Sequence, residues 1–183
     1  MPVTIQTIGH GNRSAEEFRD LLQRAGVTRL ADVRAHPGSR RHPQFSQAAL
    51  ALDLATAGIL YTWEGDALGG RRRSRGESRH VALRNASFRA YADHMESVEF
   101  TAAVDALIGS ARSEHVAIMC AERLPWQCHR YLIADYLVAH GIHVLHLIAF
   151  GSVREHALNE AARVVDGLLV YDKAGQLGLD LGR

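Results

Sequence analysis

The chain has 183 residues, of which 47% are hydrophobic and 22% are charged, and its formal net charge is +1 at pH 7. This length fits one domain spanning residues 1–183, and the composition is that of an ordinary globular protein rather than a disordered or fibrous one. A net charge this small excludes a global field that would drive the molecule onto nucleic acid or a membrane, so any basic binding surface has to be local.

The sequence also carries information on the cellular compartment. Two cysteines in a chain of this length do not make a disulfide framework. The first residues lack the basic start and apolar core of a signal peptide, and no apolar stretch reaches the ~20 residues that a membrane span needs. We therefore expect a cytoplasmic protein with reduced thiols and without a membrane partner. The sequence carries no signature of an oligomeric state.

Strand-like and helix-like segments alternate from the start of the chain. Buried strands are expected at residues 3–8, 28–33, 59–63, 116–120 and 142–148. Helices are expected after the caps Ser14 and Ser46, over residues 88–95 and 100–108 with Ser87 and Ser97 as caps, and from Pro125 to His140. This alternation predicts a three-layer α/β/α fold with a mainly parallel sheet.

Two segments depart from the alternation. Residues 64–86 show no periodicity, and a gap of this length exceeds the roughly 12–15 residues of an ordinary structureless connection. Within this gap, residues 69–76 hold two glycines at one end and four arginines, and we expect them to form a mobile cover over the site. Residues 153–163 are expected to form a short helix. Residues 168–171 and 177–181 read as a C-terminal β-hairpin.

Polar side chains follow the expected strands at the points where these strands end. His10 and Asn12 follow the first strand, Asp32 and Arg34 the second, and Cys120 and Glu122 the fourth. Right-handed crossovers place all these loops at one edge of the sheet, and open α/β folds bind ligands at that edge. We therefore predict one cleft that is lined by His10, Asp32, Arg34, Cys120, Glu122 and Arg130.

The stretch from residue 115 to residue 130 concentrates the reactive side chains. An apolar strand ends at Cys120, and the helix expected from Pro125 carries Cys128, His129 and Arg130 in its first turn. Backbone N–H groups and the helix dipole in a first turn attract anions and lower the pKa of a thiol. Cys120 itself is either an inert core thiol or a reactive one, since free cysteines are among the most buried residue types.

The loop after the second strand has the composition of an anion-binding loop. It carries Arg34, Arg40 and Arg41 among prolines. Arginine forks match phosphate or carboxylate oxygens bidentately, although a solvated loop with surface arginines is the alternative.

Metal binding is a separate question. The seven residues between the two cysteines do not make a CxxC pair, and the histidines lack HExxH spacing. We predict no structural zinc and no cofactor. A catalytic metal held by Cys120, Cys128, His129, His10, and Glu122 or Asp32 from separate loops stays an open alternative.

Four blocks of sequence occur in a characteristic order. They are TIGHGN at 7–12, DVR at 32–34 with PQF at 43–45, LGG at 68–70, and CAE at 120–122 with CHR at 128–130. This pattern, from about residue 4 to 150, resembles the bacterial family named domain of unknown function 488, in which serine is common at the position of Gly11. The resemblance implies an α/β fold and supplies no reaction. A weaker likeness, at the level of the fold, is to the rhodanese group, whose compact glycine-bearing cysteine loop is missing here.

Three functions are compatible with these features. The leading hypothesis is an enzyme acting on a phosphorylated, nucleotide-like or nucleic-acid substrate, with Glu122 or Asp32 as general acid or base. Its catalytic residues are Cys120, Glu122, Asp32 and His10, and its substrate-binding residues are Asn12, Arg34, Arg40, Arg41, Cys128, His129 and Arg130. The first alternative is a rhodanese-like thiol enzyme of sulfur or phosphoryl transfer with Cys120 as nucleophile. The second is a non-catalytic nucleotide or nucleic-acid binding module.

Overall fold

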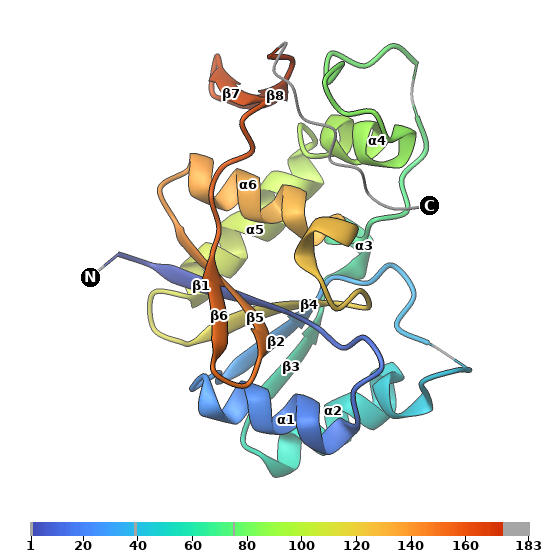
Figure 1. Ribbon diagram of the computed structural model, residues 1–183, viewed down its shortest axis with the longest axis vertical. Helices are drawn as coiled ribbons and strands as arrows, with labels where there is room; N and C mark the ends of the chain where they lie inside the picture. The colour runs from blue at the N-terminus through green and yellow to red at the C-terminus, as the bar shows by residue number, and fades with distance from the viewer. Residues whose placement is uncertain (1, 39, 75, 174–183) are drawn as a thin grey trace.

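A six-stranded sheet forms the centre of the computed structural model, which describes residues 2–38, 40–74 and 76–173 (Figure 1). The strand order is β3-β2-β4-β1-β5-β6. The strands are β1 (Thr4–Gly9), β2 (Arg29–Asp32), β3 (Leu60–Trp63), β4 (Val116–Cys120), β5 (His143–Ala149) and β6 (Ser152–Glu155). The first five are parallel and β6 runs antiparallel to β5, which confirms the prediction of a mainly parallel sheet.

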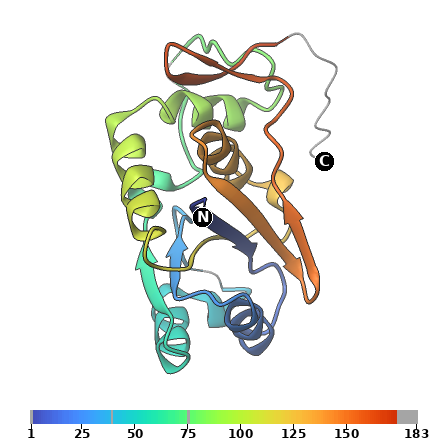
Figure 2. The same ribbon diagram turned by 90° about the vertical axis from the view of Figure 1, so that its left-hand side faces the viewer.

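Helices cover both faces of this sheet, so the three-layer prediction is also confirmed. Figures 1 and 2 show α1 (Ala15–Arg24) and α2 (Gln47–Thr56) on one side. The other side carries α3 (Gly65–Leu68), α4 (Ala86–His94), α5 (Val98–Ser110) and α6 (Arg130–Ala139). Within the described residues, no helix combines the length and the apolarity that crossing a bilayer requires.

The two faces of β4 belong to two different cores. Ala117 and Met119 pack in the core under α1 and α2, whereas Val116, Ile118 and Cys120 pack in the core under α5 and α6. This division follows from the alternation of side chains along a strand. It places the thiol of Cys120 on the α6 side of the sheet.

Two of the four expected serine caps, Ser14 and Ser97, make a capping hydrogen bond, while Ser46 precedes α2 without one. Ser14 Oγ accepts the Glu17 N–H at 3.0 Å, and Ser97 Oγ accepts the N–H of the third helical residue at 3.2 Å. The helix α4, however, begins before the expected cap Ser87. Asn85 caps it, because its Oδ1 accepts the backbone N–H groups of Ser87 and Phe88.

The prediction of a helix over residues 153–163 is wrong. Ser152–Glu155 form β6, and Ala162–Val165 form β7, which pairs with β8 (Leu168–Tyr171). The missed signal is the two-residue turn of Asp166 and Gly167, whose φ angles of 51° and 80° are the positive pair of a type I′ hairpin. The C-terminal hairpin is therefore confirmed, but its first strand is β7. The strand expected at 177–181 lies outside the described residues.

A chain of buried polar side chains joins the sheet to this hairpin. It runs from Thr7 Oγ1 to His146 Nδ1 (2.7 Å), from His146 Nε2 to His156 Nδ1 (2.9 Å), from His156 Nε2 to Asp135 Oδ1 (2.9 Å), and ends where the Tyr171 hydroxyl donates to Asp135 Oδ2 (2.9 Å). The Asp135 carboxylate accepts only, so the His156 Nε2–H donates to it. His156 Nδ1 then accepts from His146 Nε2–H, and the chain is satisfied with both imidazoles neutral.

This arrangement predicts a loss of stability in acid. Burial, together with the charges of His156, Arg130 and Arg154, lowers the pKa of His146 from 6.5 to about 3. The unfolded chain takes up this proton below about pH 6.5 while the folded chain does not, so the free energy of unfolding should fall by up to about 1.4 kcal/mol per pH unit in that window. Urea unfolding from neutral pH to about pH 4 measures the slope. His146→Gln should flatten it, and His143→Gln, on the same strand but partly exposed, should not. The same slope in all three proteins would contradict the prediction.

Candidate functional site

A cleft of about 600 Å³ lies where the neighbouring strands β2 and β4 end. It is lined by Arg34, Ala35 and His36 after β2, by Gly70 and Arg71, by Asn85, Ser87 and Phe88 at the start of α4, by Cys120, Ala121 and Glu122 after β4, and by Gln127, Cys128 and His129 before α6. Five of the residues expected at the site therefore meet in one cavity: Arg34, Cys120, Glu122, Cys128 and His129.

Two thiols and one imidazole form a cluster in this cleft. The Sγ atoms of Cys120 and Cys128 and a ring nitrogen of His129 lie within 4.8 Å of one another. His129 Nδ1 is 3.9 Å from Cys120 Sγ, and His129 Nε2 is 3.0 Å from the carbonyl oxygen of Val33. A carbonyl only accepts, so Nε2 carries the proton and the lone pair of Nδ1 faces the thiols.

The turn before α6 differs from the expected continuous helix over 125–140. Pro125–Gln127 form a 3₁₀ turn, Cys128 is extended with φ −146° and ψ 159°, and α6 begins only at Arg130. The extended residue interrupts the helix and brings its side chain to the cleft. Cys128 Sγ accepts the first N–H of α6, that of Arg130, at 3.4 Å. The thiol thus lies just outside the helix and still interacts with its N-terminus.

The two thiols differ in acidity. Burial raises the pKa of Cys128, but a hydrogen bond from Cys120, the charge of Arg130 and the Arg130 N–H together outweigh it and lower this pKa from 9.0 to about 7. The pKa of Cys120 is raised, first because its proton is held by Cys128 and then because it is buried. The thiolate therefore forms on Cys128, not on Cys120.

Asp32 lies beneath the cleft and holds Arg34 in place. Its carboxylate is fully buried and accepts hydrogen bonds from Arg34 Nε (2.9 Å), Arg34 Nη2 (2.6 Å) and the Tyr61 hydroxyl (2.7 Å). Desolvation and this carboxylate together raise the pKa of Tyr61, so its hydroxyl stays a donor. Asp32 thereby orients the guanidinium of Arg34. Arg34 lines the cleft, whereas Asp32 does not.

The structure places the other expected site residues outside the cleft lining. Arg130 is buried, and its Nη2 donates to the carbonyl oxygens of Glu122 (2.9 Å) and Arg123 (3.4 Å), so it fixes the turn after β4. Asn12, Arg40 and Arg41 are exposed at the surface.

His10 is buried in the wall between two loops. Its Nδ1 donates to the Gly11 carbonyl at 2.8 Å, and its ring stacks on Phe45 with 4.4 Å between centroids. Burial lowers the pKa of His10 to about 4, so the ring is neutral at physiological pH. It supports the loop beside β4 rather than reaching the cavity.

Three groups in the lining were not predicted as site residues. Gly70 lies against His129, and a Cβ atom added to Gly70 would be 2.4 Å from His129 Nδ1. Arg71 follows it in the cleft wall, and Arg72 donates to the Gly69 carbonyl at 2.9 Å. The segment 69–76 therefore reaches the cleft at Gly70 and Arg71, as a cover would, and its mobility stays a prediction. The residue types at 85–88 did not indicate a binding or catalytic role.

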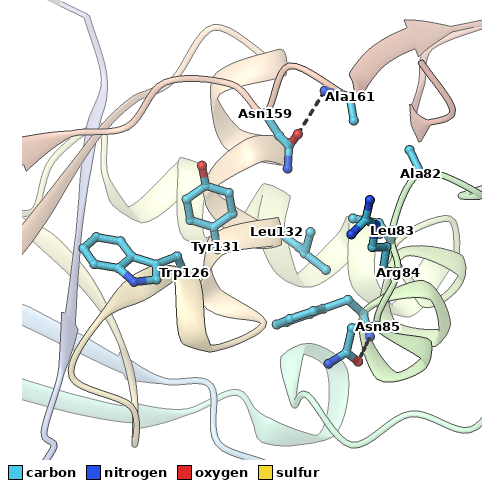
Figure 3. Close-up of a pocket in the computed structure, with 10 residues that line it drawn as sticks. Ala82, Leu83, Arg84, Asn85, Trp126, Tyr131, Leu132, Asn159 and Ala161 are labelled. Carbon is cyan, nitrogen blue, oxygen red and sulfur yellow. Dashed lines mark hydrogen bonds between the residues drawn. The ribbon is translucent and has the colours of Figure 1, made fainter. Parts of the chain in front are cut away.

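A narrow apolar pocket adjoins the cleft and shares Asn85 and Phe88 with it. Figure 3 shows Trp126, Tyr131 and Asn159 around this pocket, whose volume of about 30 Å³ holds only a few waters. The oxygen atoms of Asn85 and Asn159 accept backbone N–H groups, so the NH₂ group is the part of each amide that remains as a donor. The pocket extends the cleft with an apolar, donor-bearing wall.

Comparison with known proteins gives a family and no function. The sequence model of the domain of unknown function DUF488 matches residues 14–137, a segment that contains the complete lining of the cleft. No curated protein and no solved structure matches the chain significantly. The chain belongs to the family described as domain of unknown function DUF488.

Proposed function

We propose that the protein is an enzyme, a hydrolase or transferase, that binds a phosphorylated or nucleotide-like anion in the cleft and transforms it beside the Cys120–Cys128–His129 cluster. One observation carries this proposal: the cationic side chains of Arg34 and Arg71 line the same cavity as the reactive cluster. Guanidinium groups bind phosphate oxygens bidentately, and Arg34 is already oriented by Asp32.

The cavity favours a small substrate over a long nucleic acid. Its volume of about 600 Å³ is that of a small-molecule site. Among the described residues only two arginines line it, whereas a protein that follows a polyanion neutralises many phosphates. Glu122 is exposed and lines the cleft, so it is the general acid or base of the proposal, and a cytoplasmic location keeps the thiols reduced.

The affinity for an anion should depend on Arg71. With inorganic pyrophosphate as probe, Arg71→Gln should weaken binding by about tenfold, because a hydrogen bond to a charged group contributes about 1.5–3 kcal/mol. Isothermal titration calorimetry measures this. Arg73→Gln is the matched control, because Arg73 is exposed two residues along and does not line the cleft. Equal losses in both variants, or no binding by the unchanged protein, would contradict an anion site in the cleft.

The lowered pKa of Cys128 and the position of its thiol in the cleft support a second candidate, a thiol enzyme of phosphoryl or sulfur transfer. The Cys128 thiolate would attack phosphorus or sulfane sulfur, the leaving group would depart with the bonding electron pair, and a second acceptor would take the group and restore the thiolate. Acid quenching of a reaction with para-nitrophenyl phosphate or thiosulfate, followed by intact mass spectrometry, would then show an adduct that is lost in Cys128→Ser. Turnover without any adduct, abolished by Glu122→Gln, would reject this candidate and favour acid–base chemistry.

A further inference from the structure

We propose that Cys120, Cys128 and His129 bind a zinc ion whose fourth coordination position opens into the cleft. The binding site itself stands on the geometry below, while its role in catalysis rests on the proposed function. The zinc ion would be the reactive group of the proposed enzyme, and both cysteines would be its ligands rather than nucleophiles.

The three donor atoms already have nearly the spacing that zinc requires. Zn–S bonds of about 2.3 Å and Zn–N bonds of about 2.0–2.1 Å place tetrahedral ligands roughly 3.5–3.8 Å apart. Cys120 Sγ and His129 Nδ1 are 3.9 Å apart, and all three donors lie within 4.8 Å of one another. A contraction of less than about 1 Å would thus complete three corners of a tetrahedron.

Neighbouring backbone groups hold the imidazole of His129 and the thiol of Cys128 in the forms that bind a metal ion. The Nε2–H of His129 donates to the Val33 carbonyl, which leaves Nδ1 unprotonated and aimed at the thiols. Metal-binding histidines nearly always make such a bond with their second nitrogen. The N–H of Arg130 donates to Cys128 Sγ, as a peptide group does to a thiolate ligand. These contacts orient the donors before any ion arrives.

Gly70 lets the backbone pass close to the imidazole of His129 and so keeps this ligand beside the two thiols. A Cβ atom at Gly70 would be 2.4 Å from His129 Nδ1 and 2.7 Å from His129 Cγ. These distances are far shorter than van der Waals contacts, so a side chain at residue 70 would push the imidazole of His129 away from the two thiols. The φ angle of Gly70 is not in the left-handed region, so the backbone conformation does not demand glycine here. The close approach of His129 explains why residue 70 has no side chain.

The donor set selects zinc over the hard cations and leaves one position open. Two sulfur ligands and an imidazole suit Zn²⁺, whereas Mg²⁺ and Ca²⁺ take oxygen ligands. Three protein ligands are typical of catalytic zinc, since structural sites have four. All three residues line the cleft, and among the described residues no other trio of histidine, cysteine or acidic side chains is so placed.

A zinc ion at this site would support the hydrolysis of a phosphoester bond. Zinc lowers the pKa of a bound water to about 7. Glu122 would accept the proton of this water, the resulting hydroxide would attack phosphorus, and the bond to the leaving oxygen would break. Glu122 would then return the proton to the leaving oxygen, so that one water is consumed for each phosphoester cleaved. Arg34 and Arg71 would hold the remaining phosphate oxygens.

Cobalt spectroscopy tests the site directly. The full chain is treated with a chelator under reducing conditions and titrated with Co²⁺. We expect one equivalent to bind, with thiolate-to-cobalt absorption in the near ultraviolet and strong visible bands of a tetrahedral ion, and Zn²⁺ to displace it while Mg²⁺ does not. A chain that binds no Co²⁺ and contains no zinc by elemental analysis would overturn the proposal.

Variants separate the site from the function. Cys120→Ser and Cys128→Ser should each lower the Co²⁺ affinity by at least about 100-fold, with folding checked by circular dichroism. His36→Gln, which changes another imidazole of the cleft lining, should leave it unchanged. Binding that persists in both serine variants would identify an adventitious ion and overturn the site. Glu122→Gln should keep the ion and lose turnover. An intact cobalt spectrum without pyrophosphate binding would retain the metal site and reject the proposed function. Pyrophosphate binding without a cobalt spectrum would retain the proposed function and reject the metal site.

Discussion

A Gly9→Ala variant is expected to lose much of the protein's stability. The added methyl group would lie 1.7 Å from the Glu122 carbonyl oxygen and 2.9 Å from the Arg123 Cα. Both are backbone atoms, so no side-chain rotation relieves the clash, and β1 has to separate from the loop after β4. That separation breaks the hydrogen bonds from the His10 N–H to the Cys120 carbonyl and from the Gly11 N–H to the next carbonyl.

We estimate the loss at about 3–5 kcal/mol, because overpacking alone costs about 1–3 kcal/mol and broken buried hydrogen bonds add to it. This is a large part of the about 5–15 kcal/mol of a typical domain. Urea unfolding followed by circular dichroism measures it. Gly109→Ala is the control, since nothing lies within 4 Å of a Cβ there and α5 should gain about 0.5 kcal/mol from the better helix former. Similar midpoints for Gly9→Ala and the unchanged protein would refute the steric argument.

An Asp32→Ala variant should be destabilised by a comparable amount. It removes the carboxylate that pairs with Arg34 and accepts from the Tyr61 hydroxyl, and it leaves a guanidinium uncompensated in a buried position. Breaking a buried ion pair by removing one partner costs about 3–5 kcal/mol. The same substitution should also abolish pyrophosphate binding in the protein that remains folded, because Arg34 would lose its orientation.

Two comparisons make this prediction specific. Tyr61→Phe removes one hydrogen bond and should cost only about 1 kcal/mol. Asp172→Ala breaks a bidentate ion pair with Arg163 that lies at the surface, and it should change the unfolding midpoint little. If Asp32→Ala behaved like Asp172→Ala, the buried pair would not have the role described here.

The backbone course of the chain was largely predictable from sequence. Apolar runs such as 116–120 are long enough and bounded clearly enough to be assigned as strands, and Ser14 and Ser97 cap the helices that follow them. The parallel topology then places the ends of β2 and β4 side by side, whichever side chains follow them. The cleft lies at this edge of the sheet.

Side-chain direction was not predictable in the same way. His10 follows β1 and Arg130 begins α6, both at the expected edge of the sheet, yet their side chains turn toward backbone carbonyls of loops. Such directions depend on loop dihedral angles, as the extended Cys128 shows. The contribution of Gly70 was equally hidden, since its importance lies in the distance to His129 and not in any chemistry of its own.

The position of β1 in the sheet has a consequence for the synthesis of the protein. This strand is the first in the sequence, but its neighbours are β4 and β5, with Ile8 opposite both Met119 and Leu147. A growing chain therefore displays β1 with both edges unpaired until more than a hundred further residues have been made. Unpaired strand edges and distant partners slow folding and invite association with other chains. During translation the nascent protein consequently needs protection from aggregation, and it acquires its reactive cluster only when residues 120–129 have emerged.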